Sequence, residues 1–383
     1  MRFDKGDFPD QFFSDLAVLD IFSLYAYFLY ITKSKLYKIK RRAVMLKYAF
    51  WNNKGGTGKT TLSFQAICEL ARKKSDQKIL VIDCCPQANL SELFLGSLQG
   101  NGGNKLLQLQ GGQLRKTVGG YFELRLPTPY SAPVFTPEDF VSQPNTFNPV
   151  VPHNIDLLAG DPLLELQANT MYTLANVPSP VANNWLAVVS WLRDFLSALS
   201  TPYDYVFFDL NPSFSLYTQI ALAASDRLIL PVMADDSSRR AIQNAFSLTY
   251  GLRLPSPIYA QHAFSSQLTS GGLNPPQTHL IVKNRLTQYM GPASGYAAVL
   301  RSIDTDVANL SNANPQHFTF ASVASAFCEI RDFQTCGVVA SARGLPFARM
   351  SAKRYDVFGQ RVQVNREQLD LAIAHIDRVV SKL

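Results

Sequence analysis

A glycine-rich turn at residues 54–61 limits the possible folds of this chain more than any other segment. A short β-prone run precedes the turn, and a helical pattern of apolar residues follows it. Strand, turn and helix in this order are typical of a phosphate-binding loop, in which glycines let backbone N–H groups converge on phosphate oxygens at the positive end of the helix. The residues predicted to bind a nucleotide in this loop are Lys54, Gly55, Gly56, Thr57, Gly58, Lys59, Thr60 and Thr61.

Two side chains of this loop have distinct expected roles. The Lys59 ammonium is expected to reach the β- and γ-phosphates, and the Thr60 hydroxyl is expected to ligate Mg²⁺. The sequence therefore predicts a site for a nucleotide with Mg²⁺, although the loop itself recognises phosphates and not a particular base.

The loop also departs from the common G-x-x-x-x-G-K-[ST] pattern. Asn53 stands at the place of the first glycine, and a second lysine, Lys54, precedes the glycine pair. This variant resembles the deviant Walker A loop of the ParA/MinD family of dimerising ATPases. The resemblance implies ATP and Mg²⁺ as cofactors and an ATP-dependent homodimer. It also implies that Lys54 crosses the dimer interface to contact the nucleotide of the partner subunit.

Further segments fit the same family in the same order. Apolar runs at 78–83 and 203–210 contain acids at their carboxyl ends, Asp83 and Asp209. By resemblance, both acids hold the water shell of Mg²⁺, and Asp83 is a catalytic candidate together with Lys54 and Lys59. Asn284, near the end of a later apolar run, is the residue expected to touch adenine.

Strand-like runs alternate with helical patterns from Met45 onwards. This alternation predicts an α/β fold with a mainly parallel, twisted sheet and helices on both faces, as in P-loop NTPases of the ParA/MinD type. We expect residues 45–383 to form this ATPase domain. Within it, the glycine patches and prolines at about 98–150 predict an insertion that is an irregular surface excursion, with or without a partner contact.

Residues 1–44 differ from the rest of the chain and form an N-terminal extension. An apolar run at 16–32 is interrupted by Asp20 and is followed by basic residues. The run is short for a membrane-spanning helix and carries a charge that is costly in lipid. Three readings stay open for this extension: an over-extended start, a surface or partner helix, and a membrane anchor.

One position breaks the family pattern at the reaction centre. The second strand of the family usually ends D-x-D-P-Q, and its second Asp helps to position the attacking water. Here Cys85 stands at that place. A neutral thiol is a poor acceptor for orienting water, so we expect slow ATP hydrolysis. The alternative is a nucleotide-gated regulator that binds DNA or protein and scarcely hydrolyses ATP.

The charge pattern is compatible with an anionic partner. The chain has a net charge of +7, and residues 237–303 contain no Asp or Glu. The resemblance implies non-specific DNA binding by the ATP-bound dimer, which would be strongly salt-dependent. It also implies a ParB-like partner that stimulates ATP turnover. The candidate DNA-binding residues are Arg285, Arg343, Arg349, Lys353 and Arg354.

The last helical pattern bears on location in the cell. Residues 367–383 carry an apolar stripe, and the MinD branch of the family binds membranes through a C-terminal amphipathic helix. The stripe here has ordinary core spacing and a polar face of mixed charge, so we expect it to pack against the sheet.

No two of the five cysteines form a C-x-x-C pair. We therefore expect a cytoplasmic protein, with a MinD-like membrane ATPase as a further alternative.

Overall fold

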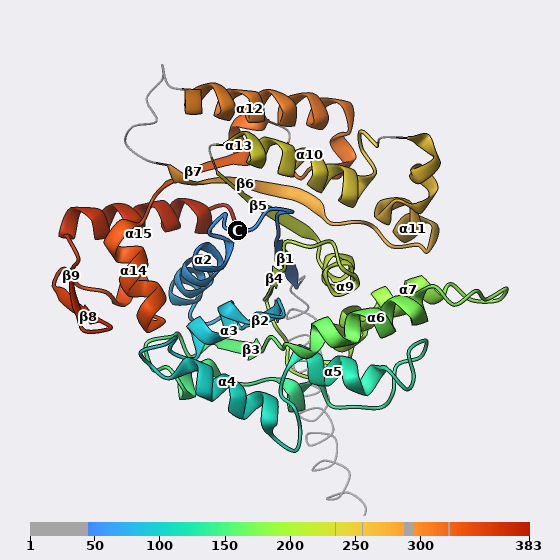
Figure 1. Cartoon of the computed structure of the whole chain (residues 1–383), viewed down its shortest axis with the longest axis horizontal. Coiled ribbons are helices and arrows are strands. Elements are labelled where there is room, and N and C mark those ends of the chain that lie inside the picture. Colours follow the sequence, from blue (N-terminus) through green and yellow to red (C-terminus); the bar gives the residue numbers. More distant parts are fainter. Residues whose placement is uncertain (1–44, 234, 255, 287–294, 321) are drawn as a thin grey trace, which may run out of the picture. The chain divides into compact units, whose positions relative to one another are not determined.

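The computed structural model describes residues 45–383, except 234, 255, 287–294 and 321 (Figure 1). The extension at 1–44 lies outside the described residues, so its three readings stay predictions. The unit that contains the phosphate loop is Leu46–Leu383.

A seven-stranded sheet, with every neighbouring pair of strands parallel, organises this unit. The strand order is β3-β2-β4-β1-β5-β6-β7. The predicted α/β fold with a mainly parallel sheet is thus confirmed. The strands are β1 (Leu46–Phe50), β2 (Ile79–Cys84), β3 (Ile155–Leu158), β4 (Tyr205–Leu210), β5 (Arg227–Val232), β6 (Gln277–Leu286) and β7 (Phe327–Arg331).

The central strands are apolar because helices cover both of their faces. Every residue of β2 and β4 is buried, which explains why these strands appear in the sequence as continuous apolar runs and not as alternating ones. The pairing of β2 with β4 sets Asp83 beside Asp209, and that of β1 with β4 sets Phe50 beside Asp209. The strands β1, β2 and β4 therefore end at the same edge of the sheet, where the phosphate loop follows β1.

Helices lie on both sides of these strands. In Figure 1, α2 and α15 lie on one side and α9 on the other. The chain also forms an antiparallel hairpin of β8 (Arg354–Val357) and β9 (Gln360–Gln363). The helices are α2 (Lys59–Lys73), α3 (Asn89–Phe94), α4 (Gly102–Gly111), α5 (Val118–Arg125), α6 (Leu163–Ala175), α7 (Asn184–Val189), α8 (Trp191–Ala198), α9 (Leu216–Ala224), α10 (Asp236–Tyr250), α11 (Phe264–Ser270), α12 (Gly295–Ala313), α13 (Val323–Ala326), α14 (Gln334–Arg343) and α15 (Arg366–Val380).

The stretch at about 98–150, predicted to be irregular, contains two helices in its first half, whereas residues 126–150 contain only two short 3-10 helices. This segment contains α4 and α5, and apolar side chains such as Leu106, Tyr121 and Phe122 are buried. Some of its glycines belong to the packing: a Cβ at Gly102 would lie 2.6 Å from the backbone oxygen of Glu92. Glycine here permits a close approach of two segments. In composition alone, a glycine needed for close packing looks the same as a glycine in a loop.

The apolar stripe of the last helix is buried in the domain. Leu369, Ile376 and Val380 of α15 are buried, and α15 packs against α2 and β7. An ion pair between Lys73 and Asp377 joins α15 to α2. The prediction that this helix packs against the rest of the domain is therefore confirmed. Among the described helices, none combines the length and the apolar character that crossing a membrane requires.

We predict that Ile376→Ala lowers the free energy of unfolding by about 2–4 kcal/mol, because it leaves a cavity between α15 and α2. Urea denaturation followed by circular dichroism measures this change. Leu371→Ala on the same helix is the control, since Leu371 is 37% exposed and Ile376 only 2%. Equal costs for the two substitutions would contradict the packing of this face.

Candidate nucleotide-binding site

The phosphate loop connects the end of β1 to the start of α2. Gly56 and Gly58 both have φ of 75°, in the left-handed region that favours glycine. The Asn284 side chain, at the end of β6, donates a hydrogen bond from Nδ2 to the carbonyl oxygen of Thr57 at 2.9 Å. A Cβ at Gly58 would lie 2.5 Å from that same Nδ2 atom. The loop thus needs glycine at this position, because β6 clamps it closely.

Lys59, Thr60 and Asp209 form a buried polar centre behind the loop. Lys59 Nζ donates to Asp209 Oδ1 at 2.8 Å, and Thr60 Oγ1 donates to Asp209 Oδ2 at 3.3 Å. The side chains of Lys59 and Asp209 are only 9% and 1% exposed. The first turn of α2 and the carboxyl end of β4 therefore present an ammonium, a hydroxyl and a carboxylate at one point.

The predicted acid Asp83 lies beside this centre but is engaged elsewhere. Its Oδ1 accepts from the Cys85 backbone N–H, and its Oδ2 accepts from the backbone N–H and the hydroxyl of Ser91. Burial, and then the charge of Asp209, raise the pKa of Asp83 to about 7. Asp83 thus fastens the segment after β2, and Asp209 is the better placed of the two acids to meet a metal ion.

Cys85 follows this acid and is nearly buried. Burial, and then the charge of Asp83, raise the pKa of its thiol to about 12. A thiol with such a pKa stays protonated near pH 7, so it offers neither a carboxylate-like acceptor nor a reactive thiolate. The electrostatics agree with the sequence argument that this position cannot orient water as an aspartate does.

Arg285 lies at the phosphate loop, where its side chain contacts Gly56. Its backbone has φ of 57°, and the β6–β7 ladder shifts register between Lys283 and Leu286. Such irregularities re-aim side chains near functional sites. Arg285 Nη1 donates to the carbonyl oxygen of Gly56 at 3.4 Å. Sequence reasoning grouped Arg285 with the other basic residues because the charge of a residue does not tell which way its side chain points.

A cavity of about 680 Å³ opens beside the loop. Gly58, Thr61 and the Asn284–Arg285 pair line one side of it, and α14 with the hairpin tip lines the other. This volume lies within the range of small-molecule sites in proteins. The nucleotide-binding candidates Gly58, Thr61 and Asn284, which are far apart in the sequence, therefore meet around one hollow.

Two of the remaining basic candidates share one aromatic ring on the C-terminal part of the domain. Arg343 and Lys353 both lie over the ring of Tyr355, at 5.5 and 5.1 Å from its centroid. Arg354 begins the hairpin, and it is exposed, as are Lys353 and Arg349. These four cations lie on α14, on the hairpin and between them, whereas Arg285 lies at the end of β6.

The remaining loop lysine, Lys54, is paired within its own chain. Its Nζ lies 2.7 and 2.6 Å from the two carboxylate oxygens of Asp235, and 3.3 Å from the Ser238 hydroxyl. Partial burial alone would raise the pKa of Asp235, but hydrogen bonds from Lys54, Ser238 and Ser237 lower it to about 2. Sequence reasoning missed Asp235, although an Asp directly before a helical pattern is a recognisable N-cap signal.

These residues fit a magnesium nucleotide. A Cβ at Gly55 or Gly56 would meet no described protein atom within 4 Å, so this part of the loop faces open space. Thr60 and Asp209 offer the oxygen ligands that Mg²⁺ prefers, and Lys59 offers a positive charge for phosphates. The fold and the site together define a P-loop nucleotide-binding protein whose loop carries the additional lysine of the ParA/MinD type.

Comparison with known proteins agrees with this class. Residues 45–249, just over half of the chain, match the model of the family described as "AAA domain". The chain therefore belongs to this family and is a P-loop ATPase of the ParA/MinD type.

Individual relatives are more distant. The chain is 27% identical over 184 residues to the chromosome partitioning protein ParA of Myxococcus xanthus, covering 48% of this chain and 50% of the relative. The chain thus spans about half the length of the first curated relatives that it matches. A structure of McdA from Cyanothece in complex with ATP has a TM-score of 0.55 at 15% identity, covering 88% of this chain and 96% of that one. The apo form of McdA gives the same TM-score, and these structures support the fold.

Proposed function

We propose that this protein is a slow ATPase that binds Mg·ATP, forms a homodimer around the nucleotide and binds DNA without sequence preference. In this proposal it serves the partition of a plasmid or chromosome, or the positioning of another cargo, in the cytoplasm on the nucleoid. The observation that carries the proposal is the buried Lys59–Asp209–Thr60 centre at the start of α2, behind a loop that also holds Lys54.

The protein side chains divide the work on the triphosphate. Lys59 and the loop N–H groups bind the phosphate oxygens, and the Thr60 hydroxyl with Asp209 would hold the metal and its water shell. The Mg²⁺ ion supplies neutralisation of the charge that develops on the phosphate oxygens. Asp209 accepts hydrogen bonds from both Lys59 and Thr60, so this one carboxylate positions the ammonium that would bind phosphate and the hydroxyl that would bind the metal.

The base and ribose fit the cavity beside the loop. A nucleotide whose phosphates lie at Gly58 and Thr61 would extend into this hollow, past Asn284 and Arg285. The Asn284 amide is committed to the carbonyl of Thr57 through Nδ2, and its Oδ1 accepts from the Arg285 N–H. We propose Asn284 as the residue beside adenine, as the family resemblance implies, and Arg285 as a nucleotide neighbour and not a DNA contact.

The partners in this proposal follow from charge and from the family. Arg343, Lys353, Arg354 and Arg349 present an exposed or half-exposed basic group that suits phosphate neutralisation. A ParB-like protein that stimulates ATP turnover is part of the proposal through the family alone. Membrane binding through α15 is not part of the proposal, because the apolar face of this helix packs against α2 and β7.

The second candidate function is a nucleotide-gated regulator with little hydrolysis. The neutral, nearly buried thiol of Cys85 favours it, since this position in the family holds the aspartate that positions water. The two functions share the nucleotide site, and the rate of ATP turnover separates them.

Cys85→Asp is expected to raise ATP turnover by about tenfold or more, because a carboxylate replaces a neutral thiol as the acceptor for the attacking water. A coupled phosphate-release assay measures the rate. Cys85→Asn, which is polar but uncharged, is the matched control and should change the rate little. A wild-type rate already equal to that of Cys85→Asp would reject the regulator and show that another group orients the water.

DNA binding tests the proposal as a whole. We expect the purified protein to bind a non-specific duplex with Mg·ATP, and much less with Mg·ADP or without nucleotide. Fluorescence anisotropy over a series of salt concentrations measures the affinity. Replacing Lys353 and Arg354 by Gln should lower the salt slope by about one to two, as expected for lost phosphate contacts. Arg366→Gln is the control, because Arg366 pairs with Asp370 on α15. Nucleotide binding with no DNA binding in any state would contradict the DNA part of the proposal.

A further inference from the structure

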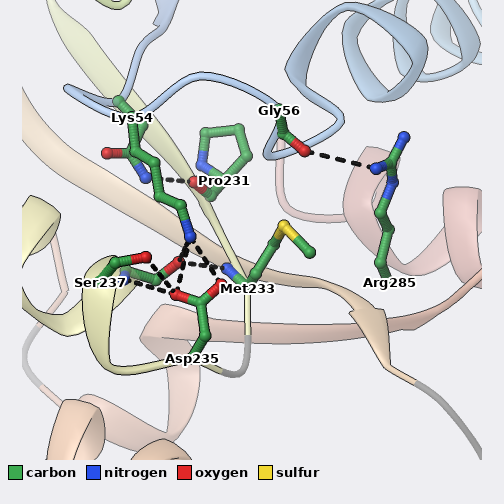
Figure 2. Close-up of polar contacts among 9 residues, drawn as sticks. Lys54, Gly56, Pro231, Met233, Asp235, Ser237 and Arg285 are labelled. Carbon is green, nitrogen blue, oxygen red and sulfur yellow. Dashed lines mark hydrogen bonds and ion pairs between the residues drawn. The ribbon is translucent and has the colours of Figure 1, made fainter.

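The Lys54 ammonium has no hydrogen left to donate. A lysine ammonium carries three N–H donors, and three acceptors surround this one: both carboxylate oxygens of Asp235 and the hydroxyl of Ser238 (Figure 2). All three acceptors lie at the start of α10 of the same chain. In this arrangement Lys54 cannot donate to a phosphate of another subunit.

The acceptor group is itself held in place. Asp235 is the N-cap residue of α10, where its Oδ1 accepts from the Ser238 backbone N–H at 2.7 Å and from the Ser237 hydroxyl at 2.9 Å (Figure 2). The Ser238 hydroxyl in turn accepts from the Met233 backbone N–H at 3.1 Å. The start of α10 therefore forms a preorganised binding site for the Lys54 ammonium, because hydrogen bonds within the helix start already hold its acceptors in place.

The pair is placed so that it can open. The side chains of Lys54 and Asp235 are 23% and 37% exposed, whereas those of Lys59 and Asp209 are 9% and 1% exposed. Ion pairs that water reaches are weak, and buried ones are costly to break. Of the two loop lysines, Lys59 is thus fixed at the polar centre, while Lys54 has an anchor that a triphosphate, with its larger negative charge, can displace.

We propose that Asp235 is a positioning residue that holds Lys54 within its own chain, and that this ion pair raises the threshold for dimerisation. The inference rests on the proposed function, in which Lys54 contacts the nucleotide of a partner subunit. Each subunit must first release Lys54 from Asp235. The dimer therefore forms only when Lys54 interacts more favourably with the nucleotide of the partner subunit than with Asp235 at the start of α10.

The test replaces the charge and keeps the helix cap. Asp235→Asn retains a side-chain oxygen that accepts from the Ser238 N–H, since Asn caps helices as well as Asp does. We expect the dissociation constant of the dimer, with Mg²⁺ and a non-hydrolysable ATP analogue, to fall by about two- to thirtyfold, because each of the two subunits no longer has to break a partly exposed ion pair. Sedimentation velocity over a series of protein concentrations measures it. Asp235→Ser, another good cap, should act in the same direction and serves if the first variant folds poorly.

Two controls separate positioning from a structural effect. Ser237→Ala removes a hydrogen bond to Asp235 but no contact of Lys54, so it should leave the dimer affinity unchanged. In a Lys54→Ala background, measured at higher protein concentration, Asp235→Asn should have no further effect, because the pair is already gone.

Each outcome decides between the readings. Tighter dimerisation of Asp235→Asn that depends on Lys54 supports the inference. Equal or weaker dimerisation, or a gain that persists with Lys54→Ala, overturns it while leaving the proposed ATP-dependent dimer intact. If neither the wild type nor the variants dimerise although they bind the analogue, the dimer itself is wrong, and the inference fails with it.

Discussion

The ion pair between Lys59 and Asp209 is the contact on which the rest of the site depends. It joins the start of α2 to the end of β4 at 2.8 Å, almost out of reach of water. Removing one partner of such a buried pair typically costs about 3–5 kcal/mol, since the other charge is left uncompensated. The pair therefore constrains the register of β1 against β4, because any shift of one strand along the other would separate Lys59 from Asp209.

The parallel sheet explains how residues far apart in the chain reach this pair. Carboxyl ends of parallel strands meet at one edge of the sheet, where ligands of such folds bind. There β1 supplies the loop, β4 supplies Asp209 and β6 supplies Asn284, which clamps Thr57. Asp83, on β2, instead accepts hydrogen bonds from Cys85 and Ser91 in the segment that follows, whereas the neighbouring acid Asp209 contacts Lys59 and Thr60 of the phosphate loop.

The apolar strands and the phosphate loop could be predicted from the sequence, because both are local patterns with a strong physical cause. The loop motif and the family resemblance assign Lys59, Thr60 and Asp209 to one site for Mg²⁺ and phosphates, and the structure brings these three side chains together. The helices α4 and α5 were not predicted, since glycines such as Gly102 mark close packing and turns alike. The ion pair between Lys54 and Asp235 could not be predicted from the sequence, because the two residues are 181 positions apart and only the folded sheet brings them together.

The most direct test of this account measures ATP affinity with and without Mg²⁺ by isothermal titration calorimetry, in the wild type and in Asp209→Asn. Mg²⁺ is expected to strengthen ATP binding to the wild type by about tenfold or more, and the variant, if circular dichroism shows it folded, should lose most of this gain. The same dependence on Mg²⁺ in both proteins, or no ATP binding by the wild type, would contradict the assignment of Asp209 and of the nucleotide site.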